Sequence, residues 1–189
     1  MKKRTKLLVM MLLGVLLSIN QVWGEDVTTT LTQTNIYNNG TGGGTGYKSI
    51  SLTNDDGYTF TGYAIKNQHS NATSTQHYLQ IRSYNNNTAY YISIPEMPGA
   101  IQSITMTVSG SSQPMTGGGC TATIYFSNSQ NSTDASSSGV SGTGANSVTI
   151  DASSLNLTSG YITASAAVRI WSIAVTYVSG SSVTYTDVL

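Results

Sequence analysis

Residues 99–110 read GAIQSITMTVSG, and this stretch decides the fold class of the chain. Ile104, Met106 and Val108 alternate with threonines, so the stretch has one apolar and one polar face. A period of two is the signature of a β-strand that is buried on one side and solvated on the other. The stretch therefore predicts a strand in an all-β protein.

Residues 168–178, VRIWSIAVTYV, match this strand in pattern and are its expected partner. The apolar phase changes between Ile170 and Ile173, so strict alternation does not fit the whole run. One extra residue in a strand shifts the phase in this way, and such an insertion is a β-bulge. We predict a bulge at Trp171 and Ser172.

The first 24 residues are organised like a secretory signal peptide. Four basic residues among the first six precede an apolar run from Leu7 to Leu17, and the small residues Val22 and Gly24 suit a cleavage site. The apolar run is too short to span a membrane. We therefore expect cleavage after Gly24, a secreted or cell-surface location, and no membrane span in the mature protein.

The mature region, residues 25–189, is mildly acidic and sparsely charged. Four of the eight Lys and Arg residues lie in the leader, whereas all eight Asp and Glu residues follow it, so the mature formal charge is −4. Nucleic-acid binding needs clustered Lys and Arg to neutralise phosphates. Nucleic acid is therefore not an expected partner. The length suits one core, so we predict a single domain over residues 25–180.

Cys120 is the only cysteine, so an internal disulfide bond cannot form. No basic residue lies near it in the sequence to lower its pKa. In an oxidising compartment an isolated thiol is protected by burial. The sequence therefore predicts a buried and unreactive Cys120.

The same alternation predicts a β-hairpin from residues 47–53 and 58–65. The two segments are joined by Asn54-Asp55-Asp56-Gly57, and an Asp-Gly step favours a tight turn. The oxygen-bearing side chains of this turn leave a calcium loop as an alternative interpretation. No acidic residue follows at the spacing that such a loop requires, so the turn is the favoured interpretation.

Other short alternating runs predict strands at 30–37, 77–83, 90–94, 121–127 and 147–151. Residues 128–147 contain Val140 as their only large apolar residue, which predicts a long mobile surface loop. The strands from 47 to 110 are expected to pair in chain order as a β-meander. No stretch has the pattern of an amphipathic helix.

These elements predict a two-sheet β-sandwich of jelly-roll type. Its shared core is expected to be built from Ile104, Met106, Val108, Ile124, Phe126, Ile170, Ile173 and Val175. Residues 181–189 include a Thr-rich alternating run similar to residues 26–31. We expect this segment to be a linker and the first strand of a truncated second module.

Four segments resemble a known group of proteins: LQIRS at 79–83, PGAIQSIT at 98–105, TIYF at 123–126 and VRIWSIAV at 168–175. Together with the Thr-rich N-terminal strand, they are similar to the tandem β-sandwich modules of large secreted proteins from gut-dwelling Gram-negative bacteria. The resemblance implies a jelly-roll unit, adhesive or carbohydrate-binding, repeated along a surface-displayed chain. It transfers no ligand-binding motif.

Carbohydrate binding needs aromatic faces for sugar C–H groups and planar polar groups for hydroxyls. The outward phase of one strand and its turn supply both, with two residues added from the preceding loop: Tyr78, Gln80, Arg82, Tyr84, Asn85, Asn87, Gln68 and His69. The favoured interpretation is that these are ordinary strand and turn residues, because tyrosine is enriched in strands, and ligand binding is the alternative. Trp171 is either a ligand-stacking or a core residue, and core packing is favoured.

The sequence offers little for catalysis or metal binding. Glu96, held between two prolines, is the acid that we would test first for hydrolysis. His69, His77 and Cys120 match no zinc spacing, and we expect neither metal nor cofactor. The leading hypothesis is a non-catalytic module that binds an extracellular polymer, most plausibly glycan. The alternatives are a structural spacer in a surface array and, third, a glycan-active hydrolase.

Overall fold

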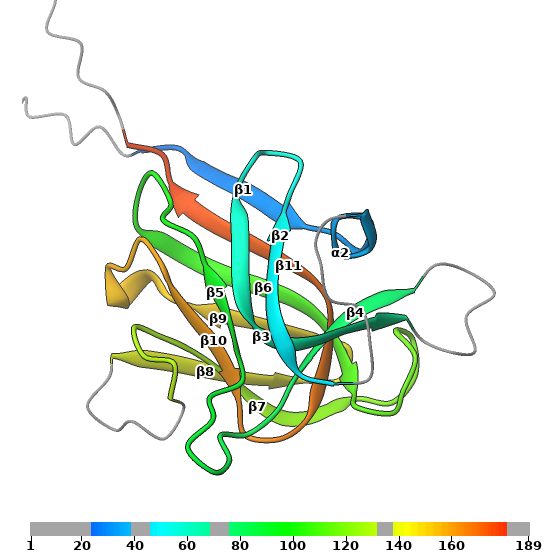
Figure 1. The fold of residues 1–189 in the computed structure, drawn as a ribbon. Coiled ribbons are helices and arrows are strands. Elements are labelled where there is room, and N and C mark those ends of the chain that lie inside the picture. Colours follow the sequence, from blue (N-terminus) through cyan, green and yellow to red (C-terminus); the bar gives the residue numbers. More distant parts are fainter. Residues whose placement is uncertain (1–23, 39–45, 69–75, 132–137, 181–189) are drawn as a thin grey trace, which may run out of the picture.

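The computed structural model describes residues 24–38, 46–68, 76–131 and 138–180 (Figure 1). The predicted signal peptide, apart from Gly24, and the predicted second-module segment at 181–189 lie outside these residues. The described part is all-β, with one short α-helix and one 3₁₀ turn. Within it, no helix is long and apolar enough to cross a membrane. The elements, in chain order, are β1 (Asp26–Leu31), α2 (Gln33–Asn38), β2 (Lys48–Thr53), β3 (Thr59–Gln68), β4 (His77–Ile81), β5 (Tyr91–Ile94), β6 (Ile101–Gly110), β7 (Cys120–Ser127), β8 (Gly139–Gly144), β9 (Ser147–Asp151), η1 (Ser153–Leu155), β10 (Gly160–Ala164) and β11 (Val168–Val178).

The strands form one large antiparallel sheet in the order β8-β7-β10-β5-β3-β4-β11-β6-β9. The two ends of this order, β8 and β9, are joined by a short turn and lie against each other. Ala145 and Asn146 of that turn accept hydrogen bonds from the backbone of Cys120 and Val108, which belong to opposite ends of the sheet. The sheet is therefore nearly closed into a barrel (Figure 1).

The two strands predicted as partners pair along most of their length. β6 and β11 run antiparallel, with Ile104 opposite Val175 and Met106 opposite Ile173. The register shifts between Ile170 and Ser172, so Trp171 is the extra residue. This shift confirms the predicted bulge, which lets Ile170 and Ile173 both face the core.

The predicted meander is correct only as far as β4, because β2, β3 and β4 pair in chain order but β5 and β6 do not follow them. β3 pairs with β2, and its first half also pairs with β5 through residues 61–63. Its second half, residues 65–68, pairs with β4. β3 therefore continues from one half of the barrel into the other, and β4 pairs with β11 rather than with β5.

The predicted core residues all lie inside the barrel. Each of the eight has no exposed surface: Ile104, Met106, Val108, Ile124, Phe126, Ile170, Ile173 and Val175. Fully burying one such side chain stabilises the fold by roughly 1.5–3 kcal/mol. The period-two pattern therefore identifies the interior correctly on both β6 and β11.

The predicted first strand at 30–37 is wrong, because the chain forms β1 and then turns into the helix α2. Thr32 starts the helix: its hydroxyl accepts a hydrogen bond from the Asn35 amide at 3.3 Å, and its amide donates to Asn35 Oδ1 at 2.8 Å. This reciprocal pair is a capping box with Asn in the third helical position. It turns the chain inward and buries Ile36 completely.

The predicted loop at 128–147 is also wrong in part, because residues 139–144 form β8, which pairs with β7. No residue of β8 is fully buried, so the strand has no apolar pattern to recognise. Glycine instead allows a close approach. A Cβ atom on Gly144 would lie 1.6 Å from the carbonyl oxygen of Ser147, at the turn into β9.

The predicted hairpin at 47–65 is confirmed, with Gly57 at φ +85° in its turn. Asn54 holds the turn closed by accepting a hydrogen bond from the Tyr58 amide at 2.9 Å. Its side-chain nitrogen donates to Thr29 Oγ1 at 2.6 Å. Asp55 and Asp56, the alternative calcium ligands, accept hydrogen bonds from Asn35 and Thr29. The turn therefore ties β2 and β3 to β1 and α2.

Candidate functional site

The described members of the predicted ligand cluster lie in four different environments. The first of these is buried on the outer face of the sheet. The alternation predicts that Tyr78 faces solvent, but it is only 5% exposed. Its ring packs edge-on against Trp171 at 5.2 Å between centroids, and the Arg169 guanidinium lies 4.3 Å from its centroid.

Trp171 has no exposed surface, and its indole nitrogen donates to Ser109 Oγ at 3.0 Å. The loop after β6 is tied to the partners of this pair, because the backbone carbonyl of Gln113 accepts hydrogen bonds from Ser109 and Arg169. Trp171 is fully buried, although it does not belong to the main core cluster. Trp171 therefore packs in the protein interior, in agreement with the favoured interpretation, and is not a stacking surface.

Gln80 and Arg82 form a second environment with tyrosines from other strands. The Arg82 guanidinium lies 4.7 Å from the centroid of Tyr90 and 5.4 Å from that of Tyr47. Gln80 Nε2 donates to the Tyr47 hydroxyl at 3.4 Å. Burial raises the pKa of the Tyr47 phenol, which keeps it neutral. Arg82 is therefore held by two aromatic rings through cation–π contacts.

Tyr84, Asn85 and Asn87 belong to the third environment, an exposed turn before β5. The backbone groups of Asn85 and Thr88 exchange two hydrogen bonds. Asn86 and Asn87 adopt left-handed φ values of 48° and 60°, which asparagine tolerates better than other residues with a Cβ atom. The Tyr84 hydroxyl donates to Asn87 Oδ1 at 3.5 Å.

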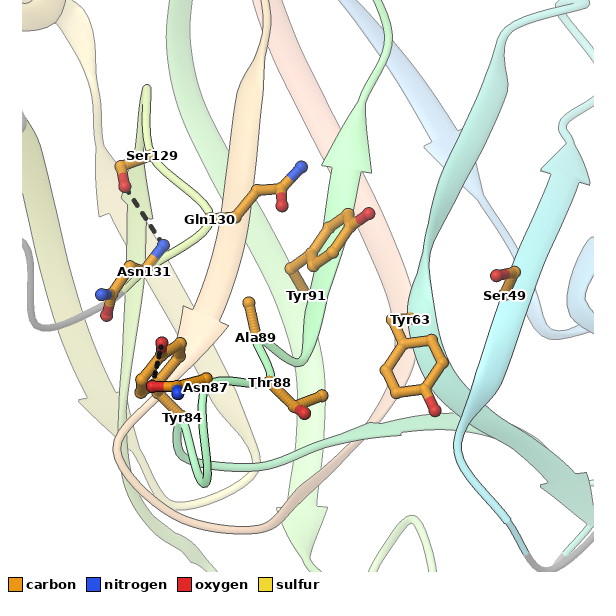
Figure 2. Close-up of a pocket in the computed structure, with 10 residues that line it drawn as sticks. All are labelled: Ser49, Tyr63, Tyr84, Asn87, Thr88, Ala89, Tyr91, Ser129, Gln130 and Asn131. Atoms are coloured by element: carbon orange, nitrogen blue, oxygen red, sulfur yellow. Dashed lines mark hydrogen bonds between the residues drawn. The ribbon is translucent and has the colours of Figure 1, made fainter.

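This turn forms one wall of an open groove of about 480 Å³ (Figure 2). Three tyrosines, one alanine and six neutral polar residues line the groove: Ser49, Tyr63, Tyr84, Asn87, Thr88, Ala89, Tyr91, Ser129, Gln130 and Asn131. None of these ten residues is charged at neutral pH. In Figure 2 Tyr91 lies in the centre, with the 129–131 loop on one side and Tyr63 and Ser49 on the other.

Of the predicted ligand residues, the groove includes Tyr84 and Asn87. Sequence reasoning missed Tyr63 and Tyr91, which lie directly opposite each other on β3 and β5. Both alternate with buried neighbours, and this phase marks them as outward-facing. The signal was present, but the pairing of β3 with β5 was not visible in the sequence.

Gln68 lies in a second, smaller cavity of about 280 Å³. The cavity is lined by Tyr37, Lys66, Asn67, Gln68 and His77. His69, the other loop residue of the predicted cluster, lies outside the described residues. The predicted cluster is therefore divided among a buried patch, the contacts of Arg82 with two tyrosines, the turn beside the groove and the smaller cavity.

The residues weighed for catalysis and metal binding are dispersed. Glu96 is exposed, and its carboxylate accepts a hydrogen bond from the Thr158 hydroxyl. Cys120 is 6% exposed, its Sγ donates to the Ala122 carbonyl at 3.3 Å, and burial raises the pKa of its thiol. The predicted burial of Cys120 is confirmed. Over the described ranges, no group of three or more His, Cys, Asp or Glu residues could hold a metal ion.

No family model matches the sequence, and comparisons with curated proteins and with solved structures return no match. The functional argument therefore depends on the residues of this chain.

Proposed function

We propose that the chain is a secreted, non-catalytic module of the β-sandwich class that binds an extracellular glycan in the groove of Figure 2. The observation that carries the proposal is the composition of the groove: three tyrosines among neutral amides and hydroxyls. The resemblance of several strands to modules of surface-displayed bacterial proteins is consistent with this function.

The groove side chains match the chemistry of a neutral sugar. Tyrosine rings offer apolar faces to sugar C–H groups, and Asn and Gln amides both donate to and accept from hydroxyls. The ten lining residues include no lysine or arginine that could pair with a carboxylate or sulfate on the ligand. The proposed ligand is therefore an uncharged glycan.

The position of the groove indicates how such a ligand lies. Tyr63 and Tyr91 are cross-strand partners, and the groove continues from β2 at Ser49 to the 129–131 loop after β7. A chain of sugars in the groove crosses the strands rather than following one of them (Figure 2). Because the groove is open along its length, it suits a polymer better than a small enclosed ligand.

The test is a glycan array probed with the full chain, followed by titration of the best neutral glycan. We expect Tyr91→Ala to weaken binding by about tenfold or more, which corresponds to about 1.4 kcal/mol. Tyr125→Ala is the matched control, because Tyr125 is a half-buried strand tyrosine that does not line the groove. Equal loss in both variants, or binding confined to acidic glycans, would refute the groove as the site.

A structural spacer in a surface array remains the second candidate. The burial of Trp171 and Tyr78 favours it, since a stacking surface would expose such rings. The arrangement of Tyr63, Tyr84 and Tyr91 around one groove favours binding. Absence of wild-type binding across the whole array would decide for the spacer.

A further inference from the structure

The smaller cavity lies where the barrel opens between the end of α2, the end of β3 and the start of β4. On β4, Leu79 and Ile81 are core residues, and His77 continues the same inward phase at the strand's first position. On β3, Lys66 lies opposite Leu79 and Gln68 lies opposite His77. The inward positions therefore change from apolar to basic and polar at the mouth of the barrel.

Burying a basic side chain costs folding free energy unless a hydrogen bond or an opposite charge compensates for it. Lys66 is 8% exposed, and its Nζ donates to the Tyr37 carbonyl at 3.4 Å. His77 is 7% exposed, and its Nε2 atom is buried with no hydrogen-bond partner in the described part of the chain. An unsatisfied buried polar atom costs about 1–3 kcal/mol, and such departures from the folding rules concentrate at functional sites.

The electrostatics of the cavity favour an anion. Among the described residues that line it, none is acidic. Burial lowers the pKa of Lys66, and burial together with the charge of Lys66 lowers the pKa of His77. A bound negative charge would offset these effects at both residues.

The remaining lining residues indicate a ligand with both polar and ring character. Asn67 and Gln68 provide amide groups, and Tyr37 is 57% exposed with its ring centroid 4.4 Å from that of His77. The volume of about 280 Å³ accommodates a ligand the size of a single sugar. Mouths of β-barrels are among the usual positions for such sites.

We propose that this cavity binds a small carboxylate-bearing ligand, with Lys66 pairing with the carboxylate and Tyr37 packing against the rest of the molecule. The carboxylate belongs either to an acidic sugar or to a free organic acid. The cavity shares no lining residue with the groove of the proposed function, so a negative result for one site does not refute the other.

The test is calorimetric titration of the full chain with glucuronate, glucose and acetate. We expect glucuronate to bind at least about tenfold more tightly than glucose, which lacks the carboxylate. If acetate binds as tightly as glucuronate, the carboxylate alone is recognised and the source is a free acid. Tighter binding of glucuronate than of acetate indicates an acidic sugar. Equal affinity for glucose and glucuronate, or no saturable binding of either anion, would overturn the proposal.

Variants and a second readout locate the binding. Lys66→Gln should reduce glucuronate affinity at least about tenfold, whereas Lys48→Gln, at an exposed position on β2, should leave it unchanged. Wild-type affinity in Lys66→Gln would overturn the proposal. Because Lys66 is buried and its replacement could unfold the protein, NMR titration of the wild type provides an independent check. Glucuronate, but not glucose, should shift the imidazole signals of His77, and their invariance would also refute the site.

Discussion

Tyr58 and Tyr177 show how one side-chain contact makes stability depend on pH. Their hydroxyls lie 3.1 Å apart, and both side chains pack against or within the core. The hydrogen bond with Tyr58 raises the pKa of Tyr177 to about 12, and burial and the nearby Asp56 act in the same direction. The folded protein therefore keeps a proton that the unfolded chain loses near pH 10.

This difference predicts a loss of stability in alkali. Between pH 10 and 12 the folded state binds more protons than the unfolded state, so the free energy of unfolding falls as the pH rises. Urea unfolding at a series of pH values should show a smaller fall for Tyr58→Phe than for the wild type. Tyr125→Phe should retain the wild-type slope, and identical slopes in all three proteins would contradict the role of the contact.

Single residues also show what periodicity can and cannot predict. The alternation on β6 and β11 places Ile104 and Val175 correctly, because the interior of a sheet imposes a strict period of two. Tyr78 has the outward phase, yet it is buried, and its ring contacts Trp171 and Arg169 of β11. Phase depends on the strand alone, whereas the covering of an outer face depends on segments far away in the sequence.

Among the elements, the β2–β3 turn is held to β1 by a few polar side chains. Asn54 is 5% exposed and joins the turn to Thr29 and to the Tyr58 amide. Asn54→Ala leaves both groups without this partner, and we expect a destabilisation of about 2 kcal/mol. Urea denaturation measures it, with the exposed Asn128→Ala as the control at less than about 0.5 kcal/mol. If the two variants are equally stable, the Asn54 hydrogen bonds do not stabilise the junction between the β2–β3 turn and β1.

The elements that could be predicted are those with local signals. The hairpin around Asn54 has a turn signal between two alternating runs, and the bulge at Trp171 follows from a change of phase. The helix α2 was missed because its six residues are too few for a helical period, although the Thr32–Asn35 capping pair marks its start. β8 was missed because glycine and serine provide no apolar alternation.

For the molecule as a whole, pairing order was the least predictable property. β3 contributes to both halves of the barrel, and β11 links β1 and β4 on one side to β6 on the other. These pairings join residues far apart in the sequence, and side-chain phase does not specify which edge meets which. The groove depends on the same unpredictable pairing, because Tyr63 and Tyr91 come together only when β3 lies beside β5.

The nearly closed strand order predicts an uneven distribution of local stability. β11 is paired on both sides and has six buried residues, whereas β8 has none and is hydrogen-bonded along one side to β7. Regions with few buried contacts open locally, while central strands exchange only through global unfolding. Native-state hydrogen exchange should therefore protect β11 and β6 most and β8 least. β2, an edge strand with Ile50 and Leu52 buried, should be intermediate. If the β8 amides exchange as slowly as those of β11, the β8–β9 closure is a rigid part of the barrel, and its glycines contribute close packing rather than a weak edge.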